Sequence, residues 1–375
     1  MQKLILFVIM SILIFPIFHH PAAADTGPPA SLHSEAAVVI DSATLEVLYD
    51  KNKHQTMYPA SITKIITTIL ALEEADQAEQ VKVSADAVNV IGSSVYLLED
   101  ETLPMGQMLR GIMVSSGNDA SIAAAEHIDG SVDAFASRMT DFAAEVGAEN
   151  TNFTNPHGLF HEDHVTTAYD MALLSAYAMS NNDFREIAGT KRLEWKAEGW
   201  ETTLYNHHDL MRQNDEITGV KNGFVRQSGY TLVTSAEKED TEIIVVTLGA
   251  PSRDHAFEDT RALVDYGLDN YRTVTLDFSN EELLTGHIIP ESYNLTVAGE
   301  DEVFYNISED GMLTVEGKEG NLIYESLLEE RYFSDLPSYI VPNDQKKVAD
   351  HPQPPPGLDV LIWLIFTGFH AIGIS

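Results

Sequence analysis

The stretch that most constrains the fold begins at Pro59 and continues through an apolar segment to Leu72. It places Ser61 and Lys64 three residues apart at the start of that segment. Because positions i and i+3 lie on the same face of an α-helix, the serine hydroxyl and the lysine amine can touch. Apolar residues fall on nearly every side of the expected helix, namely Ile62, Ile65, Ile66, Ile69, Leu70 and Leu72. The sequence therefore predicts a buried central helix that carries this pair at its start.

The serine–lysine pair has two interpretations. A serine hydroxyl is a weak nucleophile until a base removes its proton. Lys64 can be that base only in its neutral form, which burial in an apolar site favours, and the positive end of the helix dipole disfavours a second positive charge. A Ser-x-x-Lys pattern also arises by chance, with Ser61 capping a helix that Pro59 starts. The pair alone leaves a catalytic and a capping role open.

Two more polar motifs follow along the chain. Ser116-Gly117-Asn118 lies between segments 105–114 and 120–128, which are predicted to be helical. This corner either holds a hydroxyl and a carboxamide towards a neighbour or is an ordinary turn that caps the next helix. Lys221-Asn222-Gly223 lies on a predicted strand. Its lysine is either a solvated edge charge or, because the glycine lets a neighbour approach the backbone closely, part of a site.

Length and composition limit the classes of protein to which the chain can belong. Its 375 residues suggest two domains. The formal net charge of −36 argues against nucleic acid as a partner, because nothing offsets the repulsion between the protein and phosphates. The same charge argues against electrostatic docking on anionic lipid. The absence of cysteine excludes disulfides and cysteine-based metal or redox sites.

Both ends of the chain predict export and membrane attachment. Residues 1–24 have the pattern of a signal peptide, with Lys3 before an apolar run and Ala22-Ala23-Ala24 as the cleavage site. An uncleaved membrane anchor is the alternative interpretation. Residues 342–357 form a polar, proline-rich linker, and residues 358–375 are predicted to be a C-terminal membrane anchor.

The segment between these ends divides into two regions. Residues 25–272 combine helical segments with an expected hairpin over 37–49 and consecutive antiparallel strands over 219–249. This mixture predicts an α/β fold of the α+β kind, with an antiparallel sheet and a helical part. Residues 273–341 contain short alternating segments separated by turns, which predict a small all-β domain.

Three histidines, His157, His161 and His164, have a spacing seen among metal ligands. A histidine-bearing surface loop is the other interpretation. No matching acidic or histidine partner is evident elsewhere in the sequence, so we predict no metal site and no cofactor.

The three motifs in this order resemble those of the serine penicillin-recognising enzymes. Within that group the chain is most similar to the low-molecular-mass penicillin-binding proteins, the D-alanyl-D-alanine carboxypeptidases of the bacterial cell wall. The resemblance extends from about residue 36 to the C-terminus and includes Tyr58–Ser61, Asn155–Leu159, Ala168–Asp170, Ser228–Tyr230 and Leu248–Ala250. It implies a penicillin-binding-protein/β-lactamase-like transpeptidase fold, and a catalytic domain over 25–272.

The resemblance also implies roles for individual residues. Ser61 would attack the carbonyl between the last two D-alanines of a peptidoglycan stem peptide, and Lys64 would take its proton. Ser116 would relay a proton to the departing D-alanine, with Lys221 adjusting the local field. Asn118 would hydrogen-bond the substrate backbone.

Other parts of the expected site follow from the same resemblance. The backbone N–H groups of Ser61 and Phe224 would form the oxyanion hole. Gly223 would belong to the substrate-binding strand. The partners would be stem peptides ending in D-Ala-D-Ala and β-lactam antibiotics, with no metal or cofactor. The enzyme would act outside the cell, on the outer face of the cytoplasmic membrane or in the wall.

One residue departs from the family pattern. The family usually has Lys-Thr-Gly where this chain has Asn222 in the middle position. The threonine hydroxyl helps to hold the terminal carboxylate of the substrate, and a longer asparagine amide can also donate a hydrogen bond. We expect retained but altered carboxylate recognition, with Arg226 as a further candidate partner.

Two other functions stay open at this point. A class A β-lactamase would share the motifs, but it would need a deacylating glutamate in a Glu-x-x-Leu-Asn context, which is absent between Asn118 and Lys221. A non-catalytic wall-binding protein, inactivated by the change at Asn222, is the second.

Overall fold

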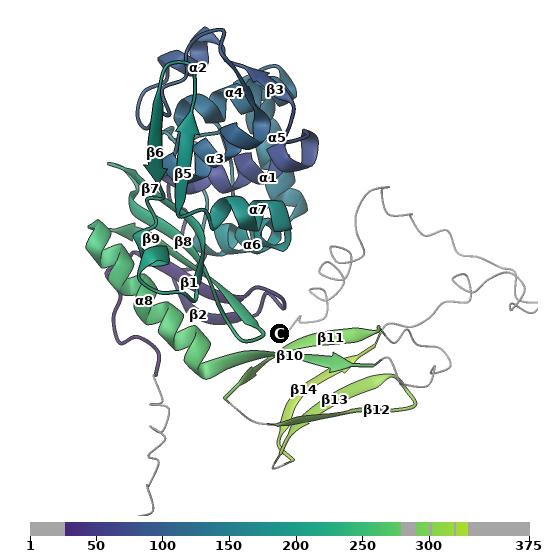
Figure 1. Cartoon of the computed structure of the whole chain (residues 1–375). Helices are drawn as coiled ribbons and strands as arrows, with labels where there is room; N and C mark the ends of the chain where they lie inside the picture. Colours follow the sequence, from purple (N-terminus) through teal and green to yellow (C-terminus); the bar gives the residue numbers. More distant parts are fainter. Residues whose placement is uncertain (1–26, 279–289, 300–301, 319, 329–375) are drawn as a thin grey trace, which may run out of the picture.

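The computed structural model describes residues 27–278, 290–299, 302–318 and 320–328 (Figure 1). The predicted signal peptide, linker and C-terminal anchor lie outside these residues. Across the described part of the chain, no helix combines the length and apolar character needed to cross a membrane.

A five-stranded antiparallel sheet forms the centre of the molecule. Its strands lie in the order β2-β1-β9-β8-β7. They are β1 (Ala36–Asp41), β2 (Val47–Lys51), β7 (Ile217–Val225), β8 (Gly229–Lys238) and β9 (Thr241–Ala250). The predicted hairpin is β1–β2, and the predicted consecutive strands are β7, β8 and β9, so both predictions are confirmed.

Helices cover both faces of this sheet. The long helix α8 (Arg253–Asn270) packs on one face, and α1 (Lys64–Glu74), α6 (Ala168–Ser180) and α7 (Asn182–Ala188) pack on the other (Figure 1). Alternate residues of a strand therefore enter different cores, because successive side chains point to opposite faces. On β1, Ala37 and Val39 enter the core beside α8, whereas Val38 and Ile40 enter the core beside α1 and α6. This explains why every residue of β1 is buried.

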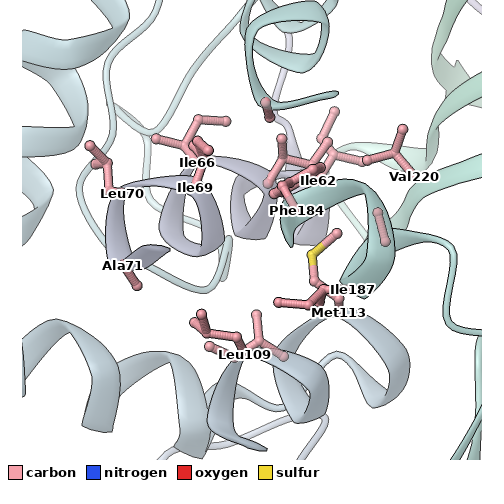
Figure 2. Packing of buried hydrophobic residues seen from close by; sticks show 14 of the residues in the cluster. Ile62, Ile66, Ile69, Leu70, Ala71, Leu109, Met113, Phe184, Ile187 and Val220 are labelled. Carbon is pink, nitrogen blue, oxygen red and sulfur yellow. The ribbon is translucent and has the colours of Figure 1, made fainter. Parts of the chain in front are cut away.

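The helical part surrounds the serine–lysine stretch. Ser61 lies in a 3₁₀ turn, η1 (Ala60–Thr63), which continues directly into α1 (Lys64–Glu74). Every residue of α1 from Lys64 to Ala71 is buried, so the predicted central helix is confirmed. Figure 2 shows apolar side chains of this stretch packed among the neighbouring helices, with Ile66, Ile69 and Leu70 on one side of α1 and Leu109 and Met113 on the other.

The other elements of this part are short helices and strand pairs. The helices are α2 (Ala85–Asn89), α3 (Met105–Ser115), α4 (Asn118–Asp129), α5 (Val132–Glu145), α6 (Ala168–Ser180), α7 (Asn182–Ala188) and the 3₁₀ turn η2 (Asp209–Arg212). The strand pairs are β3 (Gln80–Lys82) with β4 (Thr102–Pro104), and β5 (Arg192–Lys196) with β6 (Glu201–Tyr205).

A small β region with its own apolar core follows α8. It contains a two-stranded pair, β10 (Tyr271–Asp277) with β11 (Ser292–Ala298), and a three-stranded sheet of β12 (Val303–Ile307), β13 (Met312–Gly317) and β14 (Leu322–Leu327). Its core contains Leu276, Phe278, Leu295, Val297, Leu313 and Val315. The all-β character predicted from residue 273 is confirmed, and the exact domain limits stay a prediction.

The buried carboxylate of Asp41 joins this β region to the central sheet. Asp41 ends β1, and its Oδ2 accepts hydrogen bonds from the hydroxyls of Thr273 at 2.7 Å and Thr296 at 2.9 Å. Its Oδ1 accepts from the backbone N–H groups of Ala43 and Thr44. One side chain therefore fixes both the β1–β2 turn and the β10–β11 pair.

Candidate active site

Lys64 is buried with its amine in contact with Ser61. Its Nζ lies 3.2 Å from Ser61 Oγ, and it donates to Asn118 Oδ1 at 2.8 Å and to the carbonyl of His157 at 2.5 Å. Ser61 lies inside η1, whose N-cap is Pro59, while the N-cap of α1 is Thr63. The capping role left open by the sequence is therefore wrong for Ser61.

Burial controls the charge of the Lys64 amine. Desolvation holds the pKa of Lys64 well below its ordinary value, and the nearby positive charge of Lys221 lowers it further. The carboxylate of Asp119 acts in the opposite direction with a smaller effect. The neutral amine, which can accept a proton from a hydroxyl, is thus favoured at this position.

The corner between α3 and α4 brings Asn118 of the second motif to the same place. Ser116 ends α3 in the left-handed region, with φ 60°, and this turn allows Asn118 to begin α4. The oxygen of the Asn118 amide accepts from Lys64, and its nitrogen donates to the carbonyl of Ile91 at 2.7 Å. An amide nitrogen carries two N–H groups, so one remains for a substrate.

Asp119 organises the loop before α3, and sequence reasoning missed it. Its buried carboxylate accepts hydrogen bonds from the backbone N–H groups of Val95 and Leu97, each at 3.1 Å, and from the hydroxyl of Ser94. In the sequence, Asp119 is an acidic residue directly after Asn118, and this pattern is the same as that of an ordinary aspartate in the first turn of a helix. The loop contacts exist only in the folded chain.

The third motif places a second buried lysine in the site. Lys221 on β7 is only 1% exposed, so the interpretation as a solvated edge charge is wrong. Desolvation lowers its pKa to about 7. Its Nζ donates to the backbone carbonyl of Asn222 at 3.1 Å, and the side-chain oxygen of Asn222 lies 3.5 Å from the same nitrogen.

The backbone of β7 lies directly against η1 at Gly223. A Cβ atom at this position would be 2.6 Å from the backbone nitrogen of Ser61 and 2.6 Å from Thr231 Oγ1. The Thr231 hydroxyl donates to the carbonyl of Pro59 at 2.8 Å, which joins β8 to the same turn. Only glycine fits between these groups. The next residue, Phe224, is 54% exposed and lies against Tyr230.

The loop over 155–159 closes the other side of η1. Gly158 has φ +84°, and a Cβ there would be 1.9 Å from the carbonyl oxygen of Ala60. This contact brings the carbonyl of His157 to Lys64. Burial lowers the pKa of His157 to about 3, so its ring is neutral at physiological pH.

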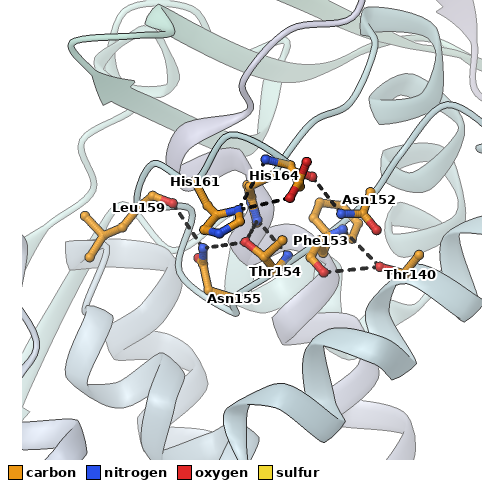
Figure 3. Close-up of polar contacts among 9 residues, drawn as sticks. Thr140, Asn152, Phe153, Thr154, Asn155, Leu159, His161 and His164 are labelled. Carbon is orange, nitrogen blue, oxygen red and sulfur yellow. Dashed lines mark hydrogen bonds and ion pairs between the residues drawn. The ribbon is translucent and has the colours of Figure 1, made fainter.

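The three histidines suggested by spacing have separate partners. Figure 3 shows His161 and His164 close to Thr154 and Asn155, and His161 Nδ1 lies 3.8 Å from the carboxylate of Asp163. His164 Nδ1 accepts from the N–H of Thr154 at 2.9 Å, and its Nε2 contacts the Thr63 hydroxyl at 2.8 Å. In the part of the chain that the structure describes, the one His/Asp/Glu group at ligand distance does not include these histidines.

Comparison with known proteins identifies the family. The model of the family described as D-alanyl-D-alanine carboxypeptidase matches residues 22–252, which contain all three motifs. The chain belongs to this carboxypeptidase family. It is 34% identical over 257 residues to the D-alanyl-D-alanine carboxypeptidase DacF of Bacillus subtilis, covering 66% of this chain and 65% of that protein. It is 32% identical over 267 residues to DacC of Escherichia coli, covering 68% and 66%. The match thus spans just under two thirds of these relatives.

Solved structures agree with this carboxypeptidase fold. Penicillin binding protein 6B from Escherichia coli superposes with a TM-score of 0.70 at 25% identity, covering 81% of this chain and 98% of that one. Penicillin binding protein 5 from Haemophilus influenzae gives 0.71 at 24% identity, covering 80% and 97%, and shows the shared fold. The predicted fold class is confirmed.

The buried His164 is expected to matter for the stability of the folded chain. His164→Ala leaves the N–H of Thr154 without its acceptor inside the protein, and should lower the free energy of unfolding by about 1–3 kcal/mol. Urea unfolding monitored by circular dichroism measures this. His161→Ala in the same loop removes an exposed ring and is the matched control. Equal effects of the two changes would contradict the assigned contacts.

The lowered pKa of Lys221 predicts a pH dependence of stability. Between a folded-state pKa of about 7 and the ordinary value of 10.5, the unfolded chain binds a proton that the folded chain does not. The free energy of unfolding therefore rises with pH across this window, by up to about 1.4 kcal/mol per pH unit from this group. Lys64 contributes with the same sign. Lys221→Met should reduce the slope of the free energy of unfolding against pH, which urea unfolding at several pH values between about 7 and 10.5 measures. An unchanged slope would contradict the assigned burial of the Lys221 amine.

Proposed function

We propose that the chain is a serine-type D-Ala-D-Ala carboxypeptidase that removes the terminal D-alanine from peptidoglycan stem peptides and is acylated by penicillins. The observation that carries this proposal is the buried, weakly basic amine of Lys64 at 3.2 Å from Ser61 Oγ. A neutral amine at that distance can take the hydroxyl proton as the hydroxyl attacks. Membership of the carboxypeptidase family supports the choice of substrate.

Acylation follows from this arrangement. Ser61 Oγ forms a bond to the carbonyl carbon between the two D-alanines, and its proton passes to Lys64. The negative charge on the carbonyl oxygen is held by the backbone N–H groups of Ser61 and Phe224, an effect worth about 3–4 kcal/mol per donor in enzymes of known mechanism. The missing Cβ at Gly223 leaves room next to the first of these donors.

The departing amine and the acyl group are then released. Ser116 relays a proton to the nitrogen of D-alanine as the peptide bond breaks, and the charge of Lys221 adjusts the field around it. Water attacks the acyl-enzyme ester, and Ser61 regains its proton. Asn118 binds the substrate backbone with its remaining N–H group. A penicillin forms the same ester with Ser61 because its ring amide mimics the scissile bond.

Asn222 is expected to set the strength of carboxylate recognition. Asn222→Thr replaces the amide, whose oxygen lies 3.5 Å from Lys221 Nζ, with a shorter hydroxyl. We expect a several-fold change in KM, roughly the worth of a single hydrogen bond, with a smaller change in kcat. Release of D-alanine from a pentapeptide measures both constants. Unchanged constants in this variant would show that the position does not limit binding.

The site of action is proposed to lie outside the cell. A substrate in the wall requires export, in line with the signal pattern over residues 1–24, and the apolar segment 358–375 would hold the enzyme on the outer face of the membrane. Cell fractionation of the full chain and of a chain ending at residue 341 tests this. Release of the shorter chain from the membrane fraction is expected, and its retention there would contradict the anchor.

A labelled penicillin separates this function from the two others. The full chain is incubated with the label, the adduct is located by mass, and its release is followed beside D-alanine release from a pentapeptide. A persistent adduct on Ser61 with D-alanine release supports the carboxypeptidase. Rapid turnover of the penicillin would indicate a β-lactamase, and failure to form an adduct would indicate a wall-binding protein.

A further inference from the structure

Three potential metal ligands meet at the beginning of α8. His33, from the segment before β1, stacks on His255 of α8 with ring centroids 3.9 Å apart and an interplanar angle of 20°. His33 Nε2 lies 3.6 Å from Glu258 Oε2. One donor atom from each of the three side chains lies within 4.8 Å of the other two. The cluster is on the α8 side of the sheet, away from α1.

The backbone around this cluster is held in place by a buried carboxylate. Asp259 is 2% exposed, and its oxygens accept from the N–H of His33 at 3.0 Å, the N–H of Ser34 at 2.7 Å and the hydroxyl of Ser34 at 2.6 Å. Glu258 precedes Asp259 on the helix, and His255 lies one turn before Glu258, on the same helix face. Both the N-terminal segment and the helix are thus fixed before any ligand arrives.

The His255 ring has an unpartnered nitrogen. Its Nδ1 is buried, and among the residues that the structure describes it has no hydrogen-bond partner. Buried polar atoms without a partner are rare in folded proteins and call for an explanation. A cation bound to this ring at Nδ1 would supply the missing partner.

We propose that His33, His255 and Glu258 form a binding site for a divalent transition metal, with Zn²⁺ as the best fit. Two imidazoles and a carboxylate are a zinc donor set, and metal–ligand bonds of about 2.0–2.2 Å place tetrahedral donors roughly 3.4 Å apart. The separation of His33 Nε2 and Glu258 Oε2 already matches this spacing. The ligand atoms lie within 4.8 Å of one another, so rotation of the stacked rings would be needed to bring the second nitrogen to the same point, and water would complete the shell.

Neighbouring positive charges do not occupy the cluster. Glu258 also lines a cavity of about 380 Å³, together with Arg253 and Arg261. Arg253 donates to the carboxylate of Asp209, and Arg261 donates to the side-chain oxygen of Gln213. Both guanidinium groups are therefore engaged with partners outside the cluster. The side chain of Glu258 is 70% exposed, which gives an ion a path of entry from solvent.

A bound ion would attach the N-terminal segment to the helix that covers the sheet. The segment before β1 is held to α8 by the hydrogen bonds to Asp259, and the metal would add a second attachment one helical turn away. Because metal binds the folded chain and not the unfolded one, it raises the unfolding temperature. At a hundredfold excess over the dissociation constant we expect a rise of about 5–10 °C.

The test uses the full chain without an affinity tag, after treatment with a chelator. Calorimetric titration with Zn²⁺ should show saturable binding, and Co²⁺ should give the absorption of a tetrahedral site. Mg²⁺ should not compete, because it prefers oxygen ligands. His33→Ala and Glu258→Gln should each weaken Zn²⁺ binding by about 10–100-fold and remove the rise in unfolding temperature.

His127→Ala is the matched control. His127 forms a comparable pair with Glu79, at 3.2 Å, but among the described residues no third potential ligand joins this pair. Its removal should leave Zn²⁺ binding unchanged. Wild-type binding by His33→Ala, an equal loss in His127→Ala, or equal affinity for Mg²⁺ would each overturn the proposal. None of these residues belongs to the proposed catalytic machinery, so penicillin acylation by the variants verifies that they are folded.

Discussion

Ser61→Ala is expected to lower D-alanine release by about 10⁴-fold or more and to abolish the penicillin adduct. The substitution removes the atom that forms the acyl bond, and no neighbouring group in the site can replace it. Lys64 keeps its other two acceptors, Asn118 Oδ1 and the carbonyl of His157, so the buried amine stays hydrogen-bonded and the fold is retained.

The measurement combines D-alanine release from a pentapeptide with mass analysis after incubation with a penicillin. Ser137→Ala, which removes an exposed hydroxyl on α5, is the control and should behave as wild type. Circular dichroism and the unfolding midpoint establish that Ser61→Ala is folded. A penicillin adduct on another residue of the folded variant would show that Ser61 is not the nucleophile.

Gly223→Ala is expected to lower activity by about 100-fold or more without changing any group that takes part in the chemistry. The added Cβ would lie 2.6 Å from the backbone nitrogen of Ser61, a contact that forces β7 and η1 apart. A displacement of about 1 Å in a reacting group can cost about 100-fold in rate. Overpacking of this kind also lowers the free energy of unfolding by about 1–3 kcal/mol.

Gly106→Ala provides the comparison for this substitution. Its Cβ would lie 2.9 Å from the flexible end of the Gln77 side chain and 3.1 Å from the Gln77 Cβ, so Gln77 must shift by a few tenths of an ångström, whereas alanine is favoured over glycine within a helix by about 1 kcal/mol. It should therefore retain full activity and a stability near that of the wild type. Penicillin acylation rates and urea unfolding distinguish the two variants. Full acylation by Gly223→Ala would contradict the assigned closeness of β7 to Ser61.

Local patterns predicted the elements that carry the site. The apolar run after Ser61 predicted the buried helix, and the consecutive strands expected over residues 219–249 included the strand that holds Lys221. The sequence left open whether Ser61 caps a helix and whether Lys221 is solvated. Both alternatives depend on burial, which is a property of the packed chain, and the structure decides against them.

Long-range contacts were beyond prediction. The hydrogen bond from Thr231 to the carbonyl of Pro59 joins residues 172 positions apart, and the loop contacts of Asp119 have no periodic signature. The sequence predicted a substrate contact for Asn118, and it gave no sign that the amide oxygen of the same residue accepts from Lys64. These contacts depend on which elements lie side by side, and the spacing of residues along one element carries no information about that.

The position of Asp41 also indicates which part of this protein can be used for attachment to a surface. The strand register places Asp41 beside Ile243, at one end of β1. Ala36, at the other end of β1, lies beside Leu248, and the paired residues Thr231 and Gly223 lie near this end of the sheet. The β10–β11 pair therefore leaves the sheet at the end remote from Ser61. Immobilisation on a sensor surface through the β12–β14 sheet should leave the active-site opening facing the solution, so that wall fragments can be presented to it directly.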